Sequence, residues 1–168
     1  MRVDAAAKLE QAAALWSLDP SDATEVVLAA CNALVAGLDT PSLRMLAAGS
    51  IRELRGSGHQ IAEVLQAASE ELAIDYPPPG SMVGREAAVR AMAARLLNGD
   101  VSPRELTTWA HRKFGHELPL AEPLAVLDDV YDTLPYTDDS VDDVDADVRA
   151  VAVAIVDRSA DARPAEPP

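Results

Sequence analysis

The chain is poor in cysteine and lacks any long apolar run. Cys31 is the only cysteine among 168 residues, so no disulfide can form within the chain and oxidative export is not implied. No apolar stretch reaches the roughly 18 residues of a membrane-spanning helix, and the first residues lack the apolar region of a secretion signal. These absences predict a cytoplasmic protein without membrane insertion.

Aromatic residues are also scarce, at 4% of the chain, although apolar residues make up 49%. The core must therefore be built from leucine, valine, isoleucine and abundant alanine, a composition that favours close-packed helices over a β-sandwich. A chain of 168 residues can bury about two-thirds of its unfolded surface in one domain. We expect an all-α fold, a compact bundle of about seven or eight helices forming a single domain over residues 1–157.

Apolar residues recur at helical spacing along most of the chain, and capping signals mark where helices begin. Thr40 followed by Pro41 is typical of a helix start, and residues 102–105 (SPRE) combine a cap, a first-turn proline and a reciprocal glutamate. Ser50 and Ser57 each precede a glutamate or glutamine at capping-box spacing. Residues 76–80 (YPPPG) predict an extended connector, because proline cannot continue a helix.

Two apolar stripes lie in the last part of the predicted helical region. Residues at spacings of three and four form the first stripe, namely Leu120, Leu124, Leu127, Tyr131 and Leu134. This stripe needs a partner, either inside the domain or across a homodimer. The second stripe is Val141, Val144, Val148, Val151 and Ile155, which favours a last helix ending near Asp157. Its β-branched residues leave a strand over 150–156 as an alternative, and the polar residues 158–168 predict a disordered tail.

The sequence contains no motif for catalysis, nucleotide binding or metal binding. Its glycine turns match neither of the common phosphate-binding patterns. His111 and His116 are five residues apart, whereas the HExxH zinc motif places two imidazoles four apart on one helix face. We therefore expect structural or surface histidines, no catalytic residues, no metal ligands and no cofactor. The basic spot at Arg112 and Lys113 is too small, in a chain of net charge −14, to predict nucleic-acid binding.

Negative charge is concentrated in the C-terminal third, over residues 114–148, which contain no lysine or arginine. The 11 acidic residues there are Glu117, Glu122, Asp128, Asp129, Asp132, Asp138, Asp139, Asp142, Asp143, Asp145 and Asp147. One interpretation is a solvated face with some aspartates capping the last helix. Another is a docking surface for a basic protein, because a field of one sign speeds association. The candidate partner-binding residues are Asp128, Asp129, Asp132, Asp138, Asp139, Asp142 and Asp143.

A third interpretation of the acidic segment is cation binding by residues 138–147. An EF-hand loop needs glycine at its sixth position and glutamate at its twelfth. Counted from Asp138, these positions hold Asp143 and Arg149, so an EF-hand is excluded. Weak adsorption of Ca²⁺ or Mg²⁺ stays open.

Two stretches, residues 38–47 (LDTPSLRMLA) and 98–103 (NGDVSP), carry a resemblance to known proteins together with Trp16. They are similar to a group of small helical proteins of unassigned function from GC-rich actinobacteria. The resemblance covers residues 10–137 and implies a helical fold. It brings no catalytic residues to this chain.

The sequence favours a non-catalytic protein-interaction module that docks a protein with a basic surface through the acidic region. An adaptor is one form of such a module, and an immunity- or antitoxin-like protein is another, since those proteins are commonly small, acidic and helical. Two other classes stay open. A carboxylate enzyme with a divalent metal would need acidic side chains from two helices to converge, and a homo-oligomeric structural protein would use the stripe from Leu120 to Leu134.

Overall fold

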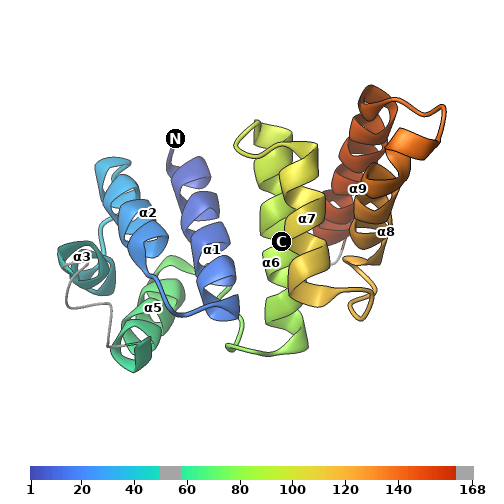
Figure 1. Cartoon of the computed structure of the whole chain (residues 1–168). Helices are drawn as coiled ribbons and strands as arrows, with labels where there is room; N and C mark the ends of the chain where they lie inside the picture. Colours follow the sequence, from blue (N-terminus) through green and yellow to red (C-terminus); the bar gives the residue numbers. More distant parts are fainter. Residues whose placement is uncertain (50–57, 162–168) are drawn as a thin grey trace. The chain divides into compact units, whose positions relative to one another are not determined.

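The structure, a computed structural model, describes residues 1–49 and 58–161, in which helices are joined by turns and loops (Figure 1). The described residues form eight α-helices and one short 3-10 helix, with no strand, which confirms the predicted all-α fold. Their contacts gather into two compact units that meet in the sequence between Ala88 and Val89. The single domain stays a prediction. None of the described helices combines the length and apolar character that crossing a membrane requires.

The first unit contains helices α1 (Arg2–Leu18), α2 (Thr24–Val35), α3 (Pro41–Ala48) and α5 (Gly58–Leu72). Helix α1 packs against α2 and α5, and α3 packs against the same two helices. Alanine dominates the buried faces, and its small side chain allows helices to approach closely. The predicted α1 stripe is confirmed, because all four of its members are buried: Ala5, Leu9, Ala12 and Trp16.

The start of α3 is held by one local cap and one distant carboxylate. The Thr40 hydroxyl accepts a hydrogen bond from the Leu43 amide, as the Thr40-Pro41 signal predicts. In addition, Glu71 at the end of α5 accepts hydrogen bonds from the Ser42 amide at 3.1 Å and the Ser42 hydroxyl at 2.9 Å. Hydrogen bonds from Thr40 and then Ser42 lower the pKa of Glu71. The predicted restarts at Ser50 and Ser57 lie outside the described residues.

Helix α6 (Met82–Asn98) follows the proline connector, which has no helical structure, as expected. The helix ends at Gly99, which adopts a φ of +82° that glycine tolerates far better than other residues. Its predicted apolar face is confirmed by the burial of four residues: Val89, Met92, Ala93 and Leu96.

The second unit contains the part of α6 from Val89 onward, α7 (Pro103–Phe114), α8 (Glu122–Thr133), the 3-10 helix η1 (Leu134–Tyr136) and α9 (Val141–Asp161). Helices α7, α8 and α9 all pack against one another (Figure 1). The side chains at the centre of this unit are nearly or fully inaccessible to solvent; they are Leu106, Ala110, Leu124, Ala125, Val148 and Ala152.

Helix α9 corrects two predictions about the end of the chain. It is continuous through residues 150–156, so the strand alternative is wrong. Val144, Val148 and Ile155 are buried at helical intervals, and this period of burial outweighs the β-preference of valine. The helix also continues to Asp161, beyond the predicted end near Asp157, while the disordered tail stays a prediction. Residues 162–168 lie outside the described ranges.

The stripe from Leu120 to Leu134 lies partly inside the second unit. Leu124 has no solvent exposure, whereas Leu120, Leu127, Tyr131 and Leu134 are half-buried. Helix α8 carries the middle of the stripe, and Leu134 begins η1. Homodimer formation through the stripe stays a prediction.

Candidate functional site

The predicted partner-binding residues lie on α8, on the segment joining η1 to α9 and on the first turn of α9. The structure separates the seven predicted partner-binding carboxylates into two environments. Asp128 alone is buried. The other six are exposed: Asp129, Asp132, Asp138, Asp139, Asp142 and Asp143.

Asp128 joins α8 to α7, with only 7% of its surface exposed. Its Oδ1 accepts hydrogen bonds from the hydroxyls of Thr107 at 3.1 Å and Thr108 at 2.9 Å. Arg104 Nη1 donates to the same oxygen at 3.0 Å, and His111 Nδ1 lies 3.0 Å from Oδ2. Contacts within the second unit therefore use most of the hydrogen-bonding positions of this carboxylate, which leaves few of them for a partner.

These contacts also set the charge of Asp128. Burial favours the neutral acid and by itself would raise the pKa. Hydrogen bonds from Thr108, His111 and Thr107, together with the Arg104 charge, outweigh burial and lower the pKa below its usual value. Asp128 is consequently ionised at neutral pH.

Arg104, in the first turn of α7, is a cation that faces the acidic segment. Beyond its contact with the Asp128 carboxylate, Nη1 donates to the Asp128 backbone carbonyl at 3.0 Å. Nη2 donates to Asp132 Oδ1 at 2.5 Å, and the guanidinium lies 4.8 Å from the centroid of the Tyr131 ring. Two carboxylates thus compensate the charge of Arg104.

The carboxylates at the start of α9 differ in what they bond. The Ser140 hydroxyl accepts from the Asp143 amide at 3.1 Å, and Asp143 Oδ2 accepts from the Ser140 hydroxyl at 2.6 Å. This reciprocal cap lowers the pKa of Asp143 through the hydrogen bonds from the Ser140 side chain and backbone. By contrast, Asp138, Asp139 and Asp142 form no ion pair or side-chain hydrogen bond within the described part of the chain.

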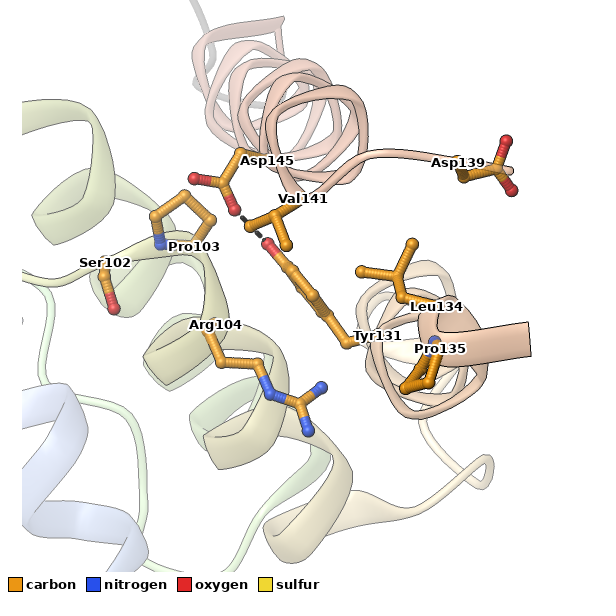
Figure 2. Close-up of a pocket in the computed structure, with 9 residues that line it drawn as sticks. All are labelled: Ser102, Pro103, Arg104, Tyr131, Leu134, Pro135, Asp139, Val141 and Asp145. Carbon is orange, nitrogen blue, oxygen red and sulfur yellow. Dashed lines mark hydrogen bonds between the residues drawn. The ribbon is translucent and has the colours of Figure 1, made fainter. Parts of the chain in front are cut away.

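An open cleft of about 670 Å³ lies next to these carboxylates, between the start of α7, the end of α8 with η1, and the start of α9 (Figure 2). Leu134, Pro135 and Val141 line it with apolar surface. Tyr131 crosses from α8 toward α9, where its hydroxyl donates a hydrogen bond to Asp145 (Figure 2). The complete lining is Ser102, Pro103, Arg104, Tyr131, Leu134, Pro135, Asp139, Val141 and Asp145.

Burial and the contact with Asp145 both favour the neutral form of the Tyr131 phenol. Burial, and then the hydrogen bond and charge of Asp145, raise the pKa of Tyr131 far above its usual value. The cleft therefore presents an apolar wall, a neutral tyrosine and carboxylates at its edge. Such a surface can cover the aliphatic stem of a basic side chain while accepting hydrogen bonds from its charged end.

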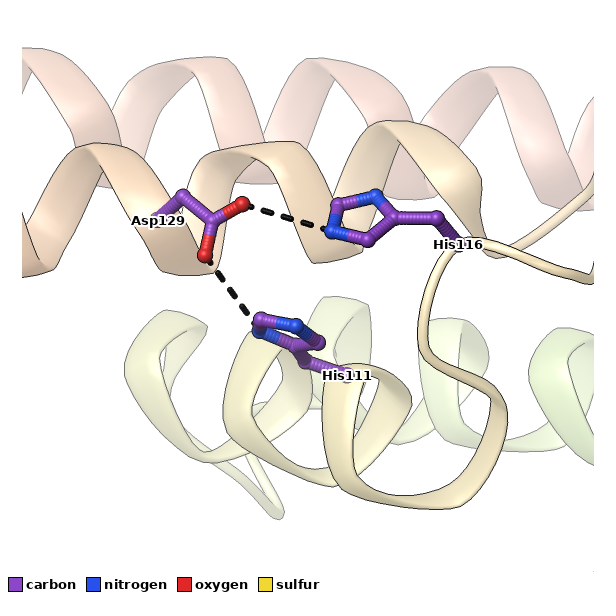
Figure 3. Close-up of side chains that lie close together, drawn as sticks. All are labelled: His111, His116 and Asp129. Atoms are coloured by element: carbon purple, nitrogen blue, oxygen red, sulfur yellow. Dashed lines mark ion pairs between the residues drawn. The ribbon is translucent and has the colours of Figure 1, made fainter.

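A second cluster lies at the other end of α7, where His111, His116 and Asp129 face one another (Figure 3). Gly115 ends α7 with a φ of +55° and a ψ of −133°, a conformation strongly favoured for glycine, and His116 follows directly. The two imidazole centroids are 5.1 Å apart. His116 Nε2 lies 3.4 Å from Asp129 Oδ2, and His111 Nδ1 lies 3.6 Å from Asp129 Oδ1. His116 Nδ1 lies 3.1 Å from Glu122 Oε2.

This cluster is the one place, among the described residues, where three His, Cys, Asp or Glu side chains bring possible ligand atoms within 4.8 Å of one another. In the same part of the chain, the carboxylates of residues 138–147 form no such group. The spacing of His111 and His116 did not reveal the cluster, because the turn at Gly115 and the packing of α8 bring its members together. Arg104 and Tyr131 were likewise absent from the predicted site, although the cap signal at Ser102 places Arg104 in the first turn of a helix.

Comparison with models of protein families, with curated proteins and with solved structures found no match to this chain. The resemblance to small actinobacterial helical proteins stays a prediction. A function is best sought in the geometry of the second unit, which holds both the cleft and the histidine cluster.

Proposed function

We propose that this protein is a non-catalytic interaction module, of the adaptor or immunity type, that docks a protein with a basic surface. The docking face consists of the cleft and of Asp138, Asp139 and Asp142 beside it. One observation carries the proposal: these three exposed carboxylates have no cationic partner in the described part of the chain, and one of them lines an apolar cleft. Asp139 belongs to both features.

The other predicted partner-binding residues already have contacts within the second unit. Asp128 is bonded inside the unit, Asp143 caps α9, and Asp132 pairs with Arg104. Asp129 faces the two histidines at the other end of α7. Asp138, Asp139 and Asp142 neither cap a helix nor pair with a cation within the described residues, which leaves them available to a partner.

Charge and shape together indicate the chemistry of the partner. Like charges at Asp138, Asp139 and Asp142 repel one another, and lysine or arginine side chains of a partner would relieve that repulsion. Val141, which is 58% exposed, and Leu134 offer apolar surface to the methylene stems of those side chains. Arg104 does not oppose such a partner, because Asp128 and Asp132 already compensate its charge.

The test compares two variants with equal charge. The first replaces three carboxylates beside the cleft, as Asp138→Asn, Asp139→Asn and Asp142→Asn, and it leaves the Asp143 cap intact. The control replaces three exposed carboxylates that do not line the cleft, as Asp75→Asn, Asp147→Asn and Asp157→Asn. A partner is isolated with the wild-type protein from the native host, and its association rate with each version is measured at low and high salt.

The first variant should associate at least several-fold more slowly than the control at low salt, and the difference should shrink at high salt because ions screen charge steering. Both variants should retain wild-type helical content. Equal association rates for the two variants at low salt would reject the docking face and leave the carboxylates as a solvated surface.

A further inference from the structure

The side-chain cluster at the end of α7 differs chemically from the carboxylates of the docking face, because it includes two imidazoles. We infer that His111, His116 and Asp129 bind one divalent transition-metal ion, and that zinc is the ion their chemistry favours. Two imidazole nitrogens with a carboxylate form a common zinc donor set, whereas Ca²⁺ and Mg²⁺ prefer oxygen ligands. The site lies outside the docking face and does not depend on the proposed interaction.

The distances suit an ion of that size. Bonds of about 2.0–2.2 Å in a tetrahedron place neighbouring ligand atoms about 3.3 Å apart. His116 Nε2 and Asp129 Oδ2 are already separated by 3.4 Å. All three possible ligand atoms lie within 4.8 Å of one another, so bringing the third into range requires a movement on the scale of a side-chain rotation.

A further carboxylate stands behind one of the two imidazoles. Glu122 Oε2 lies 3.1 Å from His116 Nδ1, so the opposite nitrogen, Nε2, is directed to Asp129. Metal-binding histidines usually have one ring nitrogen held by a carboxylate in this way, which orients the ring and increases its basicity. Glu122 is the positioning residue in this arrangement. His111 Nδ1 lies 3.0 Å from Asp128 Oδ2 and 3.6 Å from Asp129 Oδ1, so an ion on this nitrogen would replace its contact with Asp128.

The site is also accessible and attractive to a cation. The His111, His116 and Asp129 side chains are 31%, 48% and 54% exposed, so an ion can enter from solution and water can complete its coordination. The surrounding segment, residues 114–148, contains 11 acidic residues and no lysine or arginine, which raises the local concentration of divalent cations.

A bound ion would join three parts of the second unit. His111 belongs to the last turn of α7, His116 to the turn after it, and Asp129 to α8. These ligands are separated along the chain, and an ion held only by the folded arrangement stabilises that arrangement. Zinc should therefore raise the thermal midpoint of the wild-type protein.

The experiment titrates the chelator-treated full chain with zinc chloride by calorimetry and with Co²⁺ by visible absorption. Two variants remove exposed ligands, His116→Gln and Asp129→Asn. The matched control is His59→Gln, which alters the remaining histidine of the sequence. Circular dichroism of each variant establishes that helical content is unchanged.

We expect one zinc ion per wild-type chain and the same affinity in the His59→Gln control. His116→Gln and Asp129→Asn should each weaken zinc binding at least tenfold and abolish the Co²⁺ absorption bands and the thermal shift. The inference is overturned if the wild-type chain binds no zinc, or if both ligand variants bind it as tightly as the control. Displacement of zinc by a tenfold excess of Mg²⁺ would also overturn it, because it would indicate adsorption to the acidic surface.

Discussion

Arg104 and Asp128 are joined twice across the packing of α7 on α8. The same guanidinium nitrogen of Arg104, Nη1, donates to the Asp128 side chain and to its backbone carbonyl, each at 3.0 Å. The pair places a buried negative charge between two helices, and the hydroxyls of Thr107 and Thr108 complete its hydrogen bonds. The most negative part of the sequence therefore contains a carboxylate whose role is to hold the fold.

Replacing the buried carboxylate should destabilise the protein strongly. We expect Asp128→Asn to lower the free energy of unfolding by about 2 kcal/mol, because an amide accepts less strongly and turns a donor toward the donors of α7. Urea denaturation measures the effect as a lower midpoint at unchanged slope. Asp132→Asn is the control, since Asp132 is 67% exposed and its removal should cost less than about 0.5 kcal/mol. Equal midpoints for the two variants would contradict this role of Asp128.

Acid should weaken the hydrogen bonds through which Glu71 stabilises the start of α3. The pKa of Glu71 is lower in the folded chain than its unfolded value of about 4.3, because Thr40 and Ser42 donate to the carboxylate. Its stabilisation is therefore complete above the unfolded pKa and is lost as the pH falls through the folded pKa. Wild type should be more stable than Glu71→Gln at pH 7, with the difference shrinking toward pH 3. A difference in urea midpoint that persists at pH 3 would rule out ionisation as its source.

The cap of α7 offers a local test. The Ser102 hydroxyl accepts from the Glu105 amide, and Glu105 accepts from the Ser102 amide at 2.7 Å, which confirms the predicted capping box. Ser102→Ala should cost about 1 kcal/mol and lower the thermal midpoint by a few degrees. Ser102→Thr keeps the hydroxyl and should stay close to wild type. An unchanged midpoint in the alanine variant would count against the cap.

Two leucines of one stripe should respond differently to the same substitution. Leu124 has no solvent exposure, whereas Leu127 is half-buried. Leu124→Asp would bury a charge without a partner and should prevent stable folding of the second unit, while Leu127→Asp can turn its carboxylate toward water and should cost less. Circular dichroism and urea denaturation of both variants provide the measurement. Similar losses at the two positions would mean that the whole stripe is equally enclosed.

Much of the helical architecture follows from local signals. The cap at Ser102, the turn at Gly99 and the proline connector act over a few residues, so they can be recognised without knowing what packs nearby. The apolar period around Val144 and Val148 likewise identifies the buried side of α9. The intrinsic preference of β-branched residues for strands was a less reliable guide. It favoured a strand over residues 150–156, where burial at helical intervals maintains the helix.

The chemistry of the acidic segment depended on tertiary packing. Asp128 and Asp129 are adjacent in the sequence, but one is enclosed against α7 and the other faces two histidines. Successive residues of a helix point about 100° apart, so the placement of α7 and α8 decides which carboxylate is buried. His116 approaches Asp129 only because Gly115 turns the chain back toward α8. Sequence supplied the charges and the helices, while the packing of those helices determined which charges bond internally and which remain available.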